Sequence, residues 1–145
     1  GQIVLSGLNK DIDKLSISLK EKKIKNIKLS VSAPFHCKLM NKATHIMTEK
    51  INNTNFTRPN NVIISNVTGS ETQEIEEIKD LLIKQIESPV RWRESVIYMI
   101  KNGVTNFIEI GPGKVLSGLV KRIDKTINVN TINKLEDLSN IKLND

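Results

Sequence analysis

The sequence contains very few of the residue types that metal sites, disulfides and base-stacking surfaces need. Its 145 residues include one cysteine, two histidines and only 3% aromatic residues. One cysteine cannot form an internal disulfide, and one cysteine with two histidines is a poor set of metal ligands. So few aromatic side chains also argue against a surface on which nucleic-acid bases stack. The composition therefore predicts a protein without a metal or other bound cofactor.

Long apolar runs are also missing. No stretch approaches the roughly 20 apolar residues that a membrane-spanning helix needs. The first residues, GQIVLSG, do not form the basic and apolar regions of a signal peptide. Together with the single cysteine, these features favour a soluble protein in the reducing environment of the cytoplasm.

The net charge is positive, at +6, with 38% hydrophobic and 26% charged residues. This composition is typical of a globular domain, and the charge makes nucleic acid a partner to consider. The lysines are scattered, however, and cluster only between Lys20 and Lys28. A solvated basic face is therefore favoured over a nucleic-acid site, although a non-enzymatic basic binding module stays an alternative.

Hydrophobic spacing along the chain alternates between a period of two and a helical period. Residues 2–7 and 27–33 read as strands, and between them Ile12, Leu15 and Leu19 recur at helical spacing after Asn9. The sequence thus predicts a strand-helix-strand unit over residues 1–32. Further along, helices are predicted at 39–51, 71–86, 91–103, 114–123 and 134–140, and strands at 62–67, 106–110 and 127–132. Alternating strands and helices indicate an α/β architecture.

Two loops carry residues that suggest chemistry. The first, EIGPGKVL at residues 109–116, places glycines between a strand and the start of a helix, where free N–H groups can hold an anion. It has the spacing of neither a Walker A loop nor a dinucleotide fingerprint, so a structural turn is favoured.

The second loop is SAPFHCKLM at residues 32–40, which contains His36. A catalytic histidine needs a nucleophile within hydrogen-bond distance and an acceptor for its other ring nitrogen. Cys37 is adjacent in sequence, and neighbouring side chains usually diverge. No G-x-S-x-G elbow occurs in the chain, and His45 lies in a helical pattern without partners. From these residues alone, His36 is a candidate base without a nucleophile.

The motifs taken together resemble one enzyme family. The chain contains, in this order, GQIVLSG, VSAPFHCKLM, KQIESPVRWRESVIYMIKNGV and FIEIGPGKVLSGLVKRI. Their order and spacing, from Gly1 to about Ile132, resemble the C-terminal part of the malonyl-CoA:acyl carrier protein transacylases of bacterial fatty acid synthesis. The resemblance implies an α/β-hydrolase-like acyltransferase core with an inserted ferredoxin-like subdomain. Residues 1–32 would be the second half of that insertion, and residues 33–145 would be the C-terminal part of the catalytic subdomain.

The same resemblance assigns roles to three residues. His36 would be the general base of an acyl-serine mechanism that moves a malonyl group from malonyl-CoA to the thiol of acyl carrier protein. The main-chain carbonyl of Gln85 would orient the imidazole in place of a carboxylate. Phe35 matches a position associated with malonyl selection in related polyketide acyltransferase domains.

Other family residues have no counterpart here. The resemblance implies that the nucleophilic serine, the arginine that pairs with the malonyl carboxylate and the N-terminal glutamine motif all precede the part matched by this chain. The arginines of this chain occupy other motif positions: Arg58, Arg91, Arg93 and Arg122. We therefore expect these 145 residues to be inactive alone and to need the N-terminal part of their own enzyme. An acyltransferase domain of a polyketide synthase remains an alternative.

Overall fold

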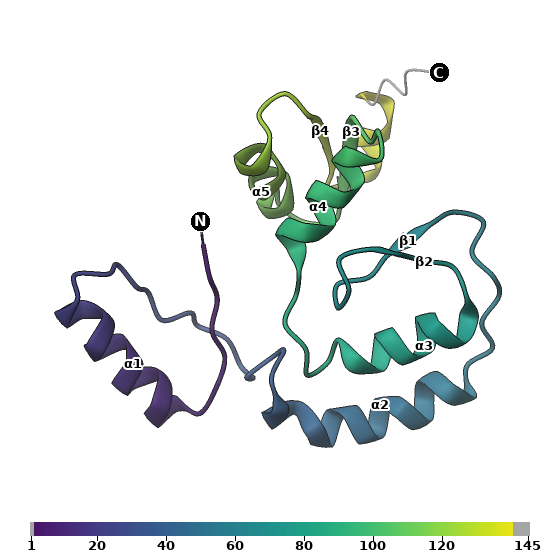
Figure 1. Ribbon diagram of the computed structural model, residues 1–145. Helices are drawn as coiled ribbons and strands as arrows, with labels where there is room; N and C mark the ends of the chain where they lie inside the picture. The colour runs from purple at the N-terminus through teal and green to yellow at the C-terminus, as the bar shows by residue number, and fades with distance from the viewer. Residues whose placement is uncertain (1, 141–145) are drawn as a thin grey trace. The chain divides into compact units, whose positions relative to one another are not determined.

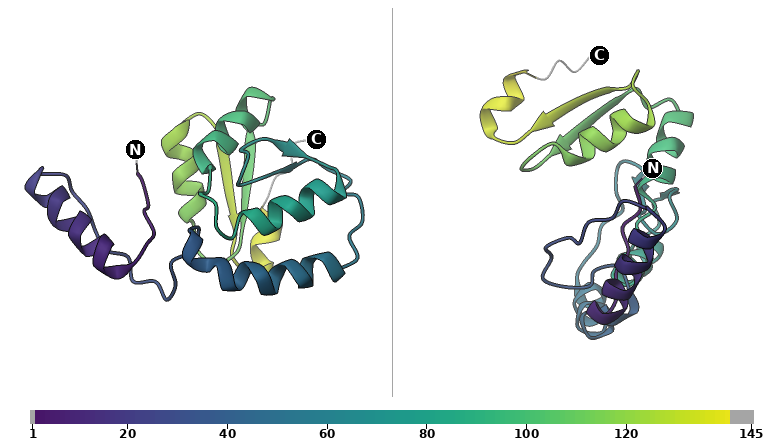
Figure 2. Two further views of the ribbon diagram at one scale, coloured as in Figure 1. Left: turned by 60° about the horizontal axis from the view of Figure 1, so that its bottom comes forward. Right: turned by 90° about the vertical axis from the view of Figure 1, so that its left-hand side faces the viewer.

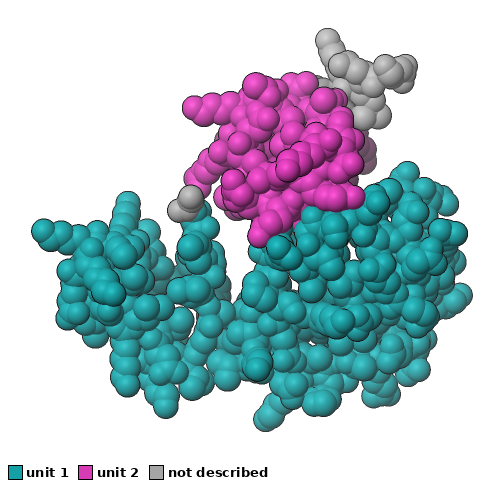
Figure 3. Space-filling model, viewed as in Figure 1, with its two compact units in different colours: residues 1–91 teal, residues 92–145 magenta. Residues whose placement is uncertain are grey.

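The computed structural model describes residues 2–140. The chain divides into two compact units, residues 1–91 and residues 92–145, and each is described by itself (Figure 3). None of the helices in residues 2–140 is long and apolar enough to cross a membrane.

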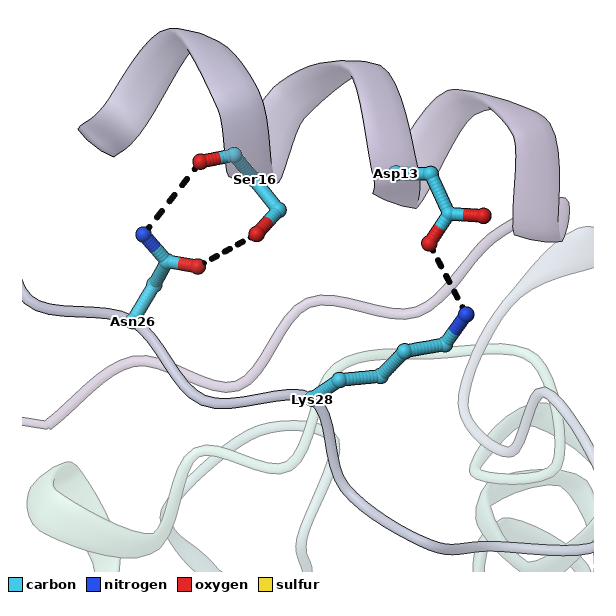
Figure 4. A network of polar contacts seen from close by, with 4 residues as sticks. All are labelled: Asp13, Ser16, Asn26 and Lys28. Carbon is cyan, nitrogen blue, oxygen red and sulfur yellow. Dashed lines mark hydrogen bonds and ion pairs between the residues drawn. The ribbon is translucent and has the colours of Figure 1, made fainter. Parts of the chain in front are cut away.

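The first unit begins with helix α1 (Asn9–Glu21), which forms where the helical period was predicted. Asp11 in its first turn and Lys20 in its last turn both favour the helix dipole. The chain then reverses and runs back along the helix (Figure 4). The Ser16 hydroxyl donates to Asn26 Oδ1 at 2.6 Å, and Lys28 Nζ lies 2.8 Å from Asp13 Oδ1. Polar side chains on alternate residues therefore face α1.

The two strands predicted beside α1, at residues 2–7 and 27–33, do not form. Within the described part of the first unit, neither segment has a paired strand, and the N–H of Val31 donates locally to the Leu29 carbonyl. The apolar residues that suggested strands are largely exposed, Ile3 by 83% and Ile27 by 75%. A strand needs a hydrogen-bonded neighbour. Both strand predictions are therefore wrong, because these segments find no hydrogen-bonded neighbour among the described residues.

Helices α2 (Asn41–Asn53) and α3 (Ile75–Lys84) pack against each other in the same unit (Figures 1 and 2). A short 3₁₀ helix, η1 (Lys38–Met40), leads into α2. The buried residues of the pair are apolar positions of the two predicted stripes: Ile51, Ile78 and Leu81. These three side chains form the apolar contact between the two helices.

Strands β1 (Ile63–Ile64) and β2 (Glu71–Thr72) form a small antiparallel hairpin whose turn contains Gly69 in the left-handed region. The helix predicted over 71–86 therefore begins later, at Ile75. Thr72 is buried and its hydroxyl donates to Glu77 Oε2 at 2.6 Å. The pairing of Glu71 and Thr72 with β1, together with the Thr72–Glu77 hydrogen bond, outweighs the helical pattern at the start of the predicted helix.

The second unit follows the predicted order closely. Helix α4 (Trp92–Lys101) leads to strand β3 (Asn106–Ile110), helix α5 (Val115–Ile123) and strand β4 (Asn128–Ile132), and a 3₁₀ helix, η2 (Leu135–Asn140), follows. The two strands are parallel, as a strand-helix-strand crossover requires (Figure 1). Val96, Val120 and Ile127 form the buried centre of this unit.

Candidate active site

The turn that carries His36 holds the backbone in an unusual conformation. His36 has φ of 61°, in the left-handed region, which costs a non-glycine residue about 1–2 kcal/mol. The adjacent Cys37 is half-buried, and its thiol donates to the main-chain oxygen of Pro34 at 3.2 Å. The thiol is thus engaged within the turn, in agreement with the prediction that Cys37 is not the partner of His36. The imidazole of His36 is exposed.

Gln85 provides the acceptor that the resemblance assigned to it. It is the C-cap residue of α3, where the last carbonyl groups of a helix have no intrahelical partner. Its main-chain oxygen lies 2.9 Å from His36 Nδ1. Because a carbonyl oxygen can only accept, this hydrogen bond requires the proton on Nδ1. In a neutral ring, Nε2 then carries a lone pair and can accept a proton.

The side chain of Gln85 has a separate partner. Asn66 follows β1, and its Nδ2 donates to Gln85 Oε1 at 3.3 Å. The main-chain oxygen of Asn66 accepts from the N–H of Arg91 at 2.8 Å. Asn66 therefore connects the end of α3 to the segment that follows Pro89. The sequence analysis did not single out Asn66. The residues around it, SNV, form no motif that would have indicated this role.

Glu87 links α3 to α2 beside the His36 contact. Its Oε1 accepts from the Thr44 hydroxyl at 2.5 Å and from Asn41 Nδ2 at 3.2 Å. The Thr44 hydrogen bond, followed by the Asn41 hydrogen bond and the electrostatic influence of the nearby His45 and Lys38, lowers the pKa of the Glu87 carboxyl below its ordinary value. The carboxylate is thus ionised near neutral pH. Glu87 was also absent from the sequence-based candidates.

Phe35 lies in the same turn as His36 and is 50% exposed. The structure therefore brings His36 and Gln85 into contact, and it leaves Phe35, the residue directly before His36, exposed. Within residues 2–140, no group of three or more histidine, cysteine or acidic side chains is arranged to hold a metal ion.

The glycine loop at residues 111–113 serves the structure of the second unit. Gly111 and Gly113 have φ of 136° and 95°, values that favour glycine. The Glu109 carboxylate accepts from the N–H groups of Leu116 at 3.1 Å and Ser117 at 2.8 Å. Ser117 and the N–H groups at the start of α5 accordingly lower the pKa of the Glu109 carboxyl. An internal carboxylate occupies these N–H groups at the start of α5, which supports the structural interpretation over the anion site.

Known proteins similar to this chain share one activity in their names. No family model matches the chain. Over 128 residues it is 44% identical to the malonyl CoA-acyl carrier protein transacylase of Bacillus subtilis, and the match covers 88% of this chain and 40% of the relative. The chain belongs to the malonyl-CoA:acyl carrier protein transacylase family. The predicted resemblance is thereby confirmed.

Solved structures of the transacylase family agree with this assignment and with the predicted α/β acyltransferase fold. The acyl carrier protein S-malonyltransferase of Vibrio cholerae has a TM-score of 0.86 at 38% identity, over 94% of this chain and 45% of that one. A type II polyketide synthase acyl-carrier protein in complex with its malonyl-transacylase gives 0.85 at 33% identity, over 92% and 43%. The chain spans less than half the length of the relatives it matches, and it matches their C-terminal part.

Proposed function

We propose that these residues supply the general base for malonyl transfer from malonyl-CoA to the thiol of acyl carrier protein. The observation that carries this proposal is the 2.9 Å contact between His36 Nδ1 and the main-chain oxygen of Gln85. It leaves Nε2 as the proton acceptor, which is what a general base needs. The reaction itself is inferred from the chain's membership of the transacylase family.

In the first half-reaction, Nε2 of His36 removes the hydroxyl proton of a serine that is not part of these 145 residues. The serine oxygen attacks the thioester carbonyl of malonyl-CoA, and the carbon–sulfur bond breaks. The proton held on Nε2 passes to the leaving sulfur of coenzyme A. The products are a malonyl-serine ester and free coenzyme A thiol, and the imidazole is neutral again.

In the second half-reaction, the serine oxygen becomes the leaving group and the thiol of the carrier protein becomes the nucleophile. Nε2 takes the proton of the carrier protein's phosphopantetheine thiol, whose sulfur attacks the malonyl ester. The serine oxygen leaves and takes the proton from the imidazolium. His36 therefore acts twice as base and twice as acid, and Gln85 holds Nδ1–H throughout. A neutral carbonyl fixes the tautomer but stabilises imidazolium less than a carboxylate would.

The two parts of the chain have different places in this proposal. We assign residues 1–32 to the second half of a ferredoxin-like subdomain and residues 33–145 to the C-terminal part of the catalytic subdomain. The net charge of +6 suits an acidic carrier protein, because complementary charges steer association. Phe35, an exposed residue directly before the proposed base in the sequence, would restrict the space near the substrate's α-carbon.

We expect the 145-residue chain alone to transfer no malonyl groups, because it lacks the G-x-S-x-G nucleophile. The direct test is a chimera in which this chain replaces the matching part of the Bacillus subtilis relative. The chimera should move labelled malonyl groups from malonyl-CoA to carrier protein. His36→Ala in the chimera should lower the rate by about 10²-fold or more, as expected for loss of a general base.

Three results would contradict the proposal or change it. Transfer by the short chain alone would overturn the need for an external nucleophile. Full activity of the His36→Ala chimera would overturn the role of His36. Preference of the active chimera for a polyketide synthase carrier over a fatty acid carrier would favour the second candidate function, because one similar solved structure contains a carrier of that class.

A further inference from the structure

Three side chains connect the end of α3 to the start of α2 next to the His36 contact. We call this set the Glu87 latch: the Glu87 carboxylate accepts from Thr44 at 2.5 Å and from Asn41 at 3.2 Å. Asn41 and Thr44 lie in the first turn of α2, and Glu87 lies just past the last turn of α3. One carboxylate oxygen thus receives two hydrogen bonds from the opposite helix.

Short, hydrogen-bonded stretches of backbone connect the latch to both members of the catalytic contact. On the α3 side, Gln85 N donates to Leu81 O and Glu87 N donates to Lys84 O, so the turn from Gln85 to Glu87 is fixed. On the α2 side, Met40 N donates to Cys37 O, which fixes the turn between His36 and Asn41. Movement at the latch would therefore alter the separation between the imidazole and the Gln85 carbonyl.

We propose that Glu87 is a positioning residue for His36, which acts by holding the start of α2 against the end of α3 at the separation that the His36–Gln85 hydrogen bond requires. This inference rests on the proposed function and adds a residue to it. Glu87 itself touches neither substrate nor the imidazole. Its effect is on the ring: while the latch is closed, Nδ1 keeps its proton and Nε2 stays available as base.

The chain offers a direct readout that does not depend on activity. It contains two histidines, so the imidazole ¹⁵N signals of the intact 145-residue chain can be assigned with a single His45→Gln variant. The measurement is made at about pH 8.5, where histidine side chains are neutral and their tautomers can be distinguished. In the unaltered chain, His36 should be mainly in the Nδ1–H tautomer.

Three variants separate positioning from general stability. Glu87→Ala should move His36 toward the Nε2–H tautomer that an unrestrained imidazole favours. Glu87→Gln keeps an acceptor oxygen for Thr44 and Asn41, so it should keep the Nδ1–H form. Glu49→Ala removes an exposed carboxylate elsewhere on α2 and should leave the His36 signals unchanged. A purely structural role for Glu87 would change the denaturation midpoint without changing the tautomer.

An unchanged His36 tautomer in Glu87→Ala, with a native amide spectrum, would overturn the inference. If that variant does not fold, Thr44→Val decides by the same readout, because it removes the donor at 2.5 Å and, apart from that, a longer contact of 3.4 Å with the main-chain oxygen of Met40. In the chimera, Glu87→Ala should lower kcat by about tenfold to 10²-fold with little change in KM. Glu87→Gln should keep most of the kcat of the unaltered chimera. An inactive unaltered chimera would overturn the proposed function, whereas the tautomer result tests the latch separately.

Discussion

Gln85 divides its contacts between Asn66 and His36: the side-chain oxygen accepts from Asn66 at 3.3 Å, while the main-chain oxygen accepts from His36 at 2.9 Å. The atom that orients the imidazole therefore belongs to the backbone. Its position depends on where α3 ends, and the side chain contributes only through Asn66. This separation allows the two contributions to be tested independently.

Gln85→Ala should preserve the orienting carbonyl and remove only the hydrogen bond with Asn66. A side-chain hydrogen bond of this kind contributes about 0.5–1.5 kcal/mol. We therefore expect transfer by the chimera to fall less than about tenfold, far less than in His36→Ala. Steady-state rates with labelled malonyl-CoA measure the difference. A loss as large as that of His36→Ala would mean that the amide side chain itself takes part in the reaction.

The left-handed backbone of His36 predicts an unusual order of stability among substitutions. His36→Gly and His36→Ala both lose the hydrogen bond to Gln85, but only glycine adopts φ of 61° without strain. His36→Gly should therefore be more stable than His36→Ala by about 1 kcal/mol, which is opposite to the order in a helix. Urea unfolding of the two variants measures this. Equal stabilities would show that the turn relaxes when the imidazole is removed.

Acid should weaken the second unit through Glu109. Its folded-state pKa is lowered by the Ser117 and Leu116 hydrogen bonds, so its contribution to stability is complete above the ordinary glutamate pKa of about 4.3. That contribution is lost as the pH falls through the lower folded-state pKa. The urea midpoint of the unaltered chain should thus fall more steeply below about pH 5 than that of Glu109→Gln.

Glu136→Gln provides the matched control for this acid dependence, because it also replaces one glutamate in the second unit. The change in the pH profile should be larger in Glu109→Gln than in Glu136→Gln. Glu87 and Asp124 also have lowered pKa values and contribute to the acid transition in every variant, so the comparison isolates Glu109. Parallel profiles for Glu109→Gln and the unaltered chain would contradict its role at the start of α5.

Local patterns predicted the elements whose partners are near in sequence. The strand at residues 106–110 forms at the predicted residues, because its parallel neighbour is reached through the single helix α5. The predicted strands 2–7 and 27–33 did not form, since pairing depends on a neighbour that periodicity cannot supply. Residues 71–72 were read as helix because an amphipathic pattern does not reveal a buried threonine in a hairpin.

Only part of the candidate site could be predicted from the sequence. His36 and Gln85 are 49 residues apart, and only the resemblance to a family connected them before the structure placed them in contact. Asn66 and Glu87 were missed for a physical reason: each acts through a side-chain hydrogen bond to a distant segment, and neither lies in a motif with its partner. Such contacts depend on how α2 and α3 pack, which sequence spacing does not specify.

The exposed ring of Phe35 leads to a prediction about substrate choice. Phe35 lies directly before His36, the proposed base, and a ring there would leave little room for a methyl group on the α-carbon of the substrate. Phe35→Ala in the chimera should therefore raise the transfer of methylmalonyl groups relative to malonyl groups. Space for one methyl group is worth about 10-fold or more in discrimination between the two substrates.

Leu39→Ala serves as the control, because Leu39 is a comparably exposed apolar residue three positions after His36. Competition between the two labelled thioesters measures the ratio directly. An unchanged ratio in Phe35→Ala, with malonyl transfer intact, would show that selectivity is set by residues elsewhere in the enzyme.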